Sequence, residues 1–280
     1  MADTVTKSVL VREPDKSIKL TITLPIEDIA KEREAFVQAA VNEAEVDGFR
    51  KGKAPRDVVE KRLDEAKVQE EILKKLLPKA YVAAVEEHGL KPIMNPKIHV
   101  HKIEPGKDWT FEAITCEAPE VKLGNYKDKV KSITAKSKII IPGKESQEPK
   151  FDEIMQAILE NVEVAVPTVL VQQEADRLLA QTLDEIKRLG LTLDQYLSST
   201  GKNPEQFRKE YEEKAKADMK LEFVLQTIAD EEKISVEEKE IEEAIQKAKD
   251  LKEKDNLQRN RYLLASILRQ QKTLDFLKNL

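Results

Sequence analysis

The 280-residue sequence is poor in the residues on which disulfide-stabilised proteins and compact enzymes rely. It contains one cysteine, eight glycines and one tryptophan, and aromatic residues make up 5% of the chain. Cys116 has no second cysteine to pair with, so we expect it to pack as a small apolar residue in a reducing compartment. With 36% charged residues, the composition is typical of long, exposed helices and argues against a deep apolar active site.

Long apolar runs are also missing. The first residues, Met1 to Ser8, lack the apolar core of a signal peptide and the arginine-rich character of a transit peptide. No later run approaches the length of a membrane span. We therefore expect a cytoplasmic protein with no membrane partner. A chain of this length exceeds the usual size of a single core, so we expect two domains.

Patterns for nucleotide, hydrolytic or metal chemistry do not stand out. The phosphate-binding pattern G-x-x-x-x-G-K-[ST] does not occur, and no nucleophile and base lie at a recognisable spacing. His99 and His101 share one face of a predicted strand, but no nearby cysteine or tight carboxylate cluster completes a ligand set. We expect no cofactor, no catalytic residue and no metal, and we expect Trp109 to be a core or sheet-edge anchor.

The first 118 residues predict an α+β domain. Residues 5–12 and 17–24 form a hairpin by their period-two alternation, and helical spacing follows Pro25. A helix starting at Pro55 continues to His88-Gly89, and two further strands follow at 97–103 and 109–116. This order predicts an antiparallel sheet with helices on one face.

The remainder of the chain divides by charge. Residues 119–150 carry eight basic and four acidic side chains and are interpreted as a basic linker, whereas residues 151–280 carry 20 and 27. The last segment predicts an all-α domain. Its helix starts and stops are marked by Pro167, by Gly190, and by capping boxes that begin at three positions, Thr192, Asn203 and Ser235.

The stretch Gly48-Phe-Arg-Lys-Gly-Lys-Ala-Pro55 places one aromatic residue among three cations on a backbone with two glycines. Residues 50–62 carry six basic and two acidic side chains, in a chain whose net charge is −5. Between an amphipathic helix and a longer one, this stretch resembles the ribosome-docking signature of the trigger factors, the bacterial chaperones that meet nascent chains at the exit tunnel. The segments 164–167, 189–196 and 228–240 resemble the C-terminal domain of the same family in their pattern of residues.

The resemblance implies an elongated protein with a ribosome-binding domain at 1–118 and a helical chaperone domain with two arms at 151–280. In the family, a prolyl isomerase domain similar to FK506-binding proteins lies between them. The roughly 30 residues at 119–150 are too few for such a domain, so we expect no enzyme activity, whether the domain was lost naturally or deleted.

The family also implies roles for single residues. Phe49 would insert into an apolar recess beside the tunnel exit, Arg50 would pair with an acidic side chain of a ribosomal protein, and Lys51 would meet that protein or rRNA phosphate. Gly48 and Gly52 would shape the loop. The expected ribosome-binding residues are Gly48, Phe49, Arg50, Lys51, Gly52, Lys53 and Pro55.

Nascent and unfolded polypeptides would be bound by apolar residues of the helical domain. Each candidate fits the core stripe of a helix as well, and the sequence leaves both readings open. The candidates are Val169, Leu170, Leu197, Phe207, Tyr211, Phe223, Leu263, Leu264, Ile267 and Leu268. Away from the ribosome, we expect a homodimer that covers Phe49. Two alternative functions are an adaptor for one folded partner and a residual prolyl isomerase.

Overall fold

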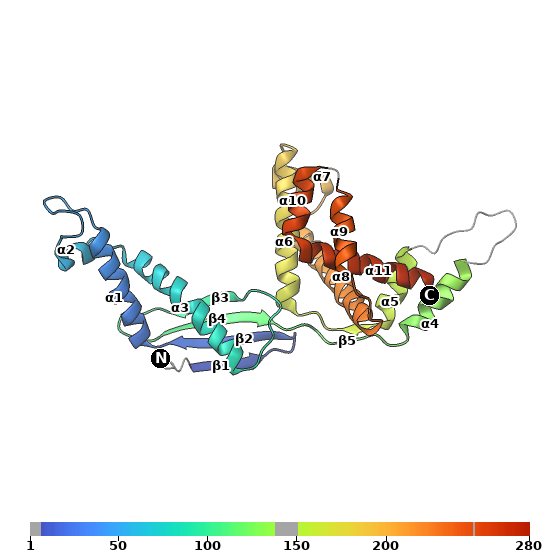
Figure 1. The fold of residues 1–280 in the computed structure, drawn as a ribbon, viewed down its shortest axis with the longest axis horizontal. Coiled ribbons are helices and arrows are strands. Elements are labelled where there is room, and N and C mark those ends of the chain that lie inside the picture. Colours follow the sequence, from blue (N-terminus) through green and yellow to red (C-terminus); the bar gives the residue numbers. More distant parts are fainter. Residues whose placement is uncertain (1–6, 138–150, 249) are drawn as a thin grey trace. The chain divides into compact units, whose positions relative to one another are not determined.

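The computed structural model describes residues 7–137, 151–248 and 250–280. The chain forms two compact units (Figure 1), which are described separately. The first contains the residues up to Ala118 together with Pro167–Leu170. The second contains Pro119–Val166 and Val171–Leu280.

A four-stranded antiparallel sheet organises the first unit, as predicted. Its strands lie in the order β1-β2-β4-β3, with β1 and β2 joined as a hairpin. Alternate residues of β2 and β4 are buried, because successive side chains of a strand point to opposite faces. The strands are β1 (Lys7–Arg12), β2 (Ser17–Leu24), β3 (Lys97–Lys102) and β4 (Trp109–Cys116).

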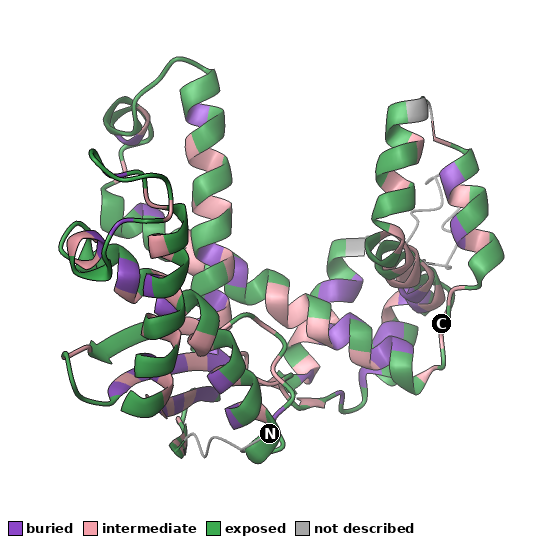
Figure 2. Ribbon diagram, turned by 60° about the vertical axis from the view of Figure 1, so that its left-hand side comes forward, coloured by how far each residue is buried: buried purple, intermediate pink, exposed green. Residues whose placement is uncertain are grey.

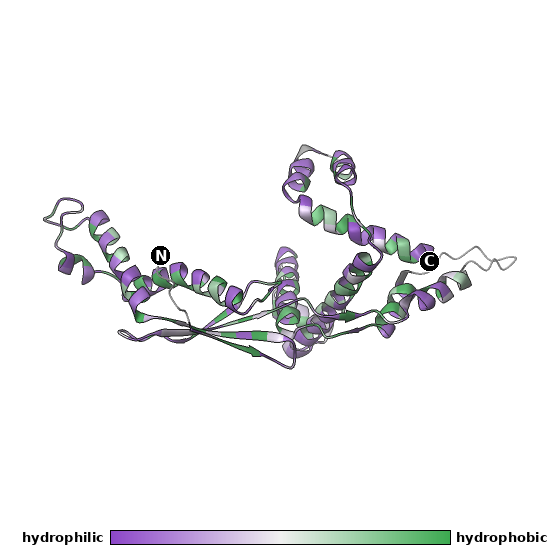
Figure 3. Cartoon of the chain, turned by 60° about the horizontal axis from the view of Figure 1, so that its bottom comes forward, coloured by the Kyte–Doolittle hydropathy of each residue, from purple (hydrophilic) through white to green (hydrophobic). Residues whose placement is uncertain are grey.

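Helices α1 (Ile26–Glu43) and α3 (Glu65–Glu87) cover one face of this sheet (Figure 3). Leu20 and Ile22 of β2 and Phe111 of β4 are almost fully buried in the core with these helices. Figure 2 shows buried positions along the strands of this sheet. Trp109 is buried in the same core, which confirms it as a structural anchor. Cys116 is also buried, and this burial raises the pKa of its thiol to about 11, so the thiol is neutral and unreactive.

The prediction of a single helix from Pro55 to His88 was wrong, because two helices occupy this range. Helix α2 (Arg56–Glu60) ends after one turn, and α3 starts afresh behind Asp64. The Asp64 carboxylate accepts a 3.1 Å hydrogen bond from the Ala66 amide and so caps α3. Pro55 is the residue before α2 and not its first helical residue.

Over its described residues, the second unit has helices and one short pair of strands, β5 (Val121–Lys122) and β6 (Glu163–Val164). The first three residues of α6 group with the first unit. The helices are α4 (Tyr126–Ser137), α5 (Phe151–Asn161), α6 (Thr168–Arg188), α7 (Leu193–Thr200), α8 (Pro204–Glu231), α9 (Glu238–Gln246), α10 (Leu251–Arg259) and α11 (Arg261–Asn279).

The segment interpreted as a basic linker differs from that expectation in its described part. Residues 119–137 form β5 and α4, and Leu123, Tyr126 and Val130 are buried in one core with residues of α5, α8 and α11. The apolar spacing of these three residues was hidden by the surrounding lysines, which remain exposed. The rest of the predicted linker, including its run of three isoleucines, lies outside the described residues.

Two of the three predicted capping boxes are confirmed. Thr192 with Gln195 caps α7, and Asn203 with Gln206 caps α8. The box predicted at Ser235 was wrong, because α9 starts two residues later with Glu237 as its N-cap. The amide of Glu237 donates to the Glu240 carboxylate, which also accepts a hydrogen bond from Lys272.

No helix in the described ranges is long and apolar enough to cross a membrane. Likewise, the described residues contain no cluster of three or more histidine, cysteine or acidic side chains that could hold a metal ion. His101 instead lies 3.8 Å from the Glu112 carboxylate on the neighbouring strand.

Candidate functional site

The loop between α1 and α2 consists of two consecutive tight turns. The Phe49 amide donates to the Val46 carbonyl at 2.9 Å, and the Lys53 amide donates to the Arg50 carbonyl at 2.9 Å. The third residue of each turn is a glycine with positive φ, +87° at Gly48 and +71° at Gly52. A positive φ at the third position is the requirement of a type II turn, and glycine meets it without steric cost.

A small apolar core fixes both ends of this loop. Val46 begins the first turn, Ala54 follows the second, and both are buried against Val59 of α2. The Gly52 amide also donates to the carbonyl of Ala44, at the end of α1, with a distance of 3.1 Å. Phe49 lies outside this core and is 47% exposed. The loop therefore holds a large aromatic side chain in solvent between two anchored ends.

The cations around the loop fall into two groups. Arg56 is engaged by Glu34 and Glu60, and Lys51 pairs with Glu45 at 3.2 Å. Over the described ranges, no ion pair is formed by four other exposed cations, Arg50, Lys53, Lys61 and Arg62. Within the described structure, no carboxylate therefore neutralises these four side chains.

The ten predicted client-binding residues separate by exposure. Val169, Leu197 and Phe207 are buried and offer no surface to a client in this structure. Leu263 and Ile267 of α11 are 59% and 51% exposed. The partly buried group contains Leu170, Tyr211, Phe223, Leu264 and Leu268.

The aromatic candidates on α8 serve to pack helices together. Phe207 meets Tyr196 of α7 edge-on at a centroid distance of 5.8 Å and Tyr211 at 4.8 Å. The Tyr211 hydroxyl shares a 2.8 Å hydrogen bond with Thr182 of α6. Phe207 and Tyr211 thus join α6, α7 and α8, and their aromatic rings are committed to that role.

Among the described residues of the helical unit, four exposed large apolar residues were missed by the sequence analysis. Leu189, Leu191 and Leu193, around the turn between α6 and α7, are 76%, 41% and 37% exposed, and Tyr262 of α11 is 91% exposed. The leucines carried a readable signal, because Leu189 and Leu191 flank the helix-ending Gly190 and Leu193 follows as the first residue of α7. Tyr262 carried none, since one aromatic in a helical stripe fits the core equally well. Tyr262, Leu263 and Ile267 are the exposed large apolar residues of α11, and we name these three residues the α11 patch.

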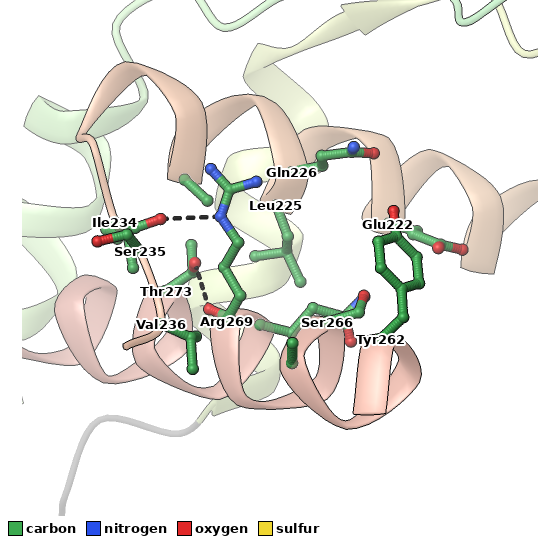
Figure 4. A pocket seen from close by; sticks show the side chains of 13 residues that line it. Glu222, Leu225, Gln226, Ile234, Ser235, Val236, Tyr262, Ser266, Arg269 and Thr273 are labelled. Atoms are coloured by element: carbon green, nitrogen blue, oxygen red, sulfur yellow. Dashed lines mark hydrogen bonds between the residues drawn. The ribbon is translucent and has the colours of Figure 1, made fainter. Parts of the chain in front are cut away.

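A cavity of about 510 Å³ lies between α8, the α8–α9 connection and α11. Its apolar wall includes Leu225 and Val236, and Figure 4 shows Tyr262 and Glu222 at one end, with Arg269 between the helices. The Arg269 guanidinium donates to the Ile234 carbonyl at 2.8 Å and to Asp230 at 2.6 Å, so its charge is used internally.

Glu222 is the second charged residue of that cavity. Its side chain is exposed, yet neighbouring groups partly desolvate the carboxyl and raise its pKa, and the nearby Glu174 raises it further. The cavity therefore combines an apolar wall with one acidic group, Glu222, and one internally paired cation, Arg269.

Both units match one class of protein, the bacterial trigger factors. The family "Bacterial trigger factor protein (TF)" matches residues 7–148, and the family "Bacterial trigger factor protein (TF) C-terminus" matches residues 142–279. The chain belongs to the trigger factor family, as the resemblance of its docking-loop stretch indicated.

Similar proteins include the trigger factors of Staphylococcus aureus strains JH9 and Newman. Each is 42% identical over 108 residues, which is 39% of this chain and 25% of the relative. The matched part thus spans about a quarter of the length of these curated relatives. A solved structure of a trigger factor chaperone, described for promiscuous substrate recognition in folding and assembly, has a TM-score of 0.65 at 16% identity. The match covers 98% of this chain and 99% of that one, and it shows a common fold.

Proposed function

We propose that this protein is an ATP-independent chaperone that docks at the ribosomal exit tunnel through the loop Gly48–Pro55 and shields nascent or unfolded polypeptides with apolar patches on its helical unit. The observation that carries the docking proposal is the 47% exposure of Phe49 between two anchored turns. When a partner buries an aromatic side chain that its own backbone holds in water, the free energy of the system falls.

Docking would use the residue roles that membership of the family implies. Phe49 enters an apolar recess, Arg50 pairs with an acidic ribosomal side chain, and Lys51 leaves Glu45 for the ribosomal protein or rRNA phosphate. The pair of Lys51 with Glu45 is exposed on both sides and therefore weak, so this exchange costs little. Contacts with phosphate release counterions, and docking should weaken as salt rises.

Client binding would use patches rather than one deep site. One exposed set would be Leu189, Leu191 and Leu193, and the other would be the α11 patch of Tyr262, Leu263 and Ile267. A chaperone without a nucleotide cycle has to bind many sequences weakly, for which small exposed apolar areas among charged groups are suited. Of these residues, Tyr262 also lines the cavity between α8 and α11.

Prolyl isomerase activity is not part of this proposal. The described residues of the segment between the two domains, 119–137, supply Leu123, Tyr126 and Val130 to the core of the helical unit. They are therefore committed to packing and do not contribute to a separate catalytic domain. Acceleration of proline-limited refolding by the purified chain would contradict this part of the proposal.

Co-sedimentation with empty 70S ribosomes at low and moderate salt tests the docking step. The wild type is compared with a variant in which Phe49, Arg50 and Lys51 are all alanine. A matched control replaces one exposed apolar residue and two exposed cations elsewhere in the first unit, Lys79, Val82 and Lys91. We expect salt-sensitive binding that only the loop variant loses. A wild type that stays in the supernatant at low salt would favour the adaptor function.

Suppression of aggregation of a denatured protein, without ATP, tests the client step. We expect activity at stoichiometric amounts and no preference for one native protein, whereas an adaptor saturates with a single folded partner. Sedimentation of the free chain tests the homodimer, which should dissociate in the loop variant if Phe49 lies at its interface.

A further inference from the structure

We propose that Arg56 is a positioning residue of the docking loop and not one of its ribosome contacts. Its guanidinium fastens the one-turn helix α2, and with it the outgoing end of the loop, to α1. This inference rests on the docking function proposed above, although its structural part can be tested without ribosomes.

The central contact joins Arg56 to Glu34 of α1. Arg56 Nη1 donates to Glu34 Oε1 and Nη2 donates to Oε2, both at 2.6 Å. This is the two-pronged arrangement in which a planar guanidinium matches a carboxylate, and it fixes orientation as well as distance. The pairing lowers the pKa of Glu34 and raises that of Arg56, so both groups stay charged together at neutral pH.

A second layer of contacts extends this pair into a network across three helices. Arg56 also reaches Glu60 at 3.4 Å, the same Glu60 oxygen accepts from Arg33 at 3.3 Å, and Arg33 reaches Glu65 of α3 at 3.3 Å. One exposed ion pair contributes little to stability, but a network with two-pronged geometry restricts position more strongly.

Helix α2 has only five residues, so it depends on contacts with α1 for its stability and position. Isolated helices of this length do not form in water, since the cost of starting a helix is not recovered in one turn. Val59 of α2 packs on Val46 and Ala54, which flank the loop on either side. A shift of α2 would therefore move both ends of the loop and the Phe49 side chain between them.

Arg56 lies in the stretch 50–62, whose six basic and two acidic side chains would suit contacts with rRNA phosphate. Its donors are directed at Glu34 and Glu60, and its charge is balanced within the chain. Arg50 and Lys53 have no such partner in the described structure. A guanidinium already held by two carboxylates adds little attraction for phosphate, whereas a fixed loop loses less conformational entropy on docking.

Two substitutions distinguish a positioning role of Arg56 from a direct contact with the ribosome. Arg56→Lys keeps the charge and removes the fork, so a positioning role predicts docking about fivefold weaker, whereas a phosphate contact predicts nearly wild-type affinity. Glu34→Gln removes a negative charge and releases Arg56. A positioning role again predicts weaker docking, whereas a phosphate contact predicts tighter docking.

Glu45→Gln is the matched control for Glu34→Gln. It also removes one carboxylate next to the loop, but the cation that it releases is Lys51, a proposed ribosome contact. We expect it to strengthen docking to 70S ribosomes, opposite in sign to Glu34→Gln. If Glu34→Gln tightens docking as Glu45→Gln does, Arg56 is a contact residue and the proposal is overturned.

Hydrogen exchange of the loop amides tests positioning without the ribosome. In Arg56→Lys and Glu34→Gln we expect faster exchange at Gly52 and Lys53, whose amides are hydrogen-bonded, with little change in the thermal melting of the core. Unchanged exchange in both variants overturns the positioning role. Should wild-type protein not bind ribosomes while the exchange rates rise as expected, the docking function fails and the positioning role stands.

Discussion

A side chain at Gly52 would place its Cβ atom 2.6 Å from the backbone oxygen of Asn42, whereas a Cβ at Gly48 would meet no atom within 4 Å. Both glycines have a positive φ, but only Gly52 lies against the end of α1. The two glycines of the docking loop are therefore required for different physical reasons. Gly48 is needed for backbone conformation alone, and Gly52 is needed for conformation and for space.

Alanine substitutions at Gly48 and Gly52 should weaken ribosome docking to different extents. Gly48→Ala places a Cβ in a left-handed conformation, which costs about 1–2 kcal/mol, and leaves the loop in place. Gly52→Ala adds a collision with rigid backbone, so the second turn has to move away from α1. We expect Gly52→Ala to weaken ribosome docking clearly more than Gly48→Ala in co-sedimentation. Equal losses in the two variants would show that contact with the Asn42 backbone does not set the loop position.

The sequence identified the loop and its glycines but not this contact. Alternation of apolar residues and the positions of Pro25 and Gly89 were sufficient to predict the sheet and its flanking helices, because those signals are local. The approach of Gly52 to Asn42 depends on how the chain folds back on α1. The partners of Arg56 depend on the same reversal, which residue spacing does not encode.

For apolar residues on helices, the sequence likewise did not predict which side chains are buried and which are exposed. Phe207 and Leu263 both fit a helical stripe, yet Phe207 is 5% exposed and Leu263 is 59% exposed. Only the packing of neighbouring helices separates them. The core residues Leu123, Tyr126 and Val130 were overlooked because a lysine-rich average composition outweighed their spacing of three and four residues.

Removing the Phe207 ring should destabilise the helical unit. Phe207→Ala deletes a buried aromatic that joins α7 and α8, and a loss of about 3 kcal/mol in the free energy of unfolding is expected for a cavity of this kind. Tyr262→Ala is the control, because its 91% exposed ring should change stability by no more than about 0.5 kcal/mol. Denaturant unfolding of both variants measures the difference. Similar stabilities would mean that the aromatic cluster does not hold these helices together.

The α11 patch should bind clients without supporting the fold. Changing Tyr262, Leu263 and Ile267 together to serine removes most of its exposed apolar area, and we expect affinity for a denatured protein to fall about fivefold. A control changes three exposed charged residues of the helical unit, Lys214, Glu242 and Lys252, to serine. Fluorescence titration with the denatured protein gives the affinities, and melting confirms folding. An unchanged affinity in the patch variant would place client binding elsewhere.

Glu232 links α8 to the segment that the sequence indicated was a linker. Its carboxylate accepts hydrogen bonds from Lys127 at 2.5 Å and from the Tyr126 hydroxyl at 3.1 Å. The Lys127 contact is the main cause that lowers the pKa of Glu232 below its ordinary value of 4.5. Burial raises the pKa of Tyr126 above its ordinary value of 10.0, and the charge of Glu232 raises it further.

These shifts set a pH window for the contact between α4 and α8. Because the pKa of Glu232 is lower in the folded state, its stabilisation is present above about pH 4.5 and is lost as pH falls below it. The Tyr126 contribution is present below about pH 10 and is lost as pH rises above it, through the higher pKa of the folded state. Glu232→Gln should therefore cost about 0.5 kcal/mol at pH 7, a small value because the pair is partly solvated, and almost nothing at pH 3.

Urea unfolding of wild type and Glu232→Gln at pH 7 and pH 3 measures that difference, with Glu242→Gln as an exposed glutamate control. If α4 were an independent linker, the stability of the helical unit would not respond to Glu232→Gln at either pH. A cost that is present at pH 7 and absent at pH 3, and not shared by Glu242→Gln, ties residues 119–137 energetically to α8. The same result would support the proposal that this segment completes the helical unit and forms no part of an isomerase domain.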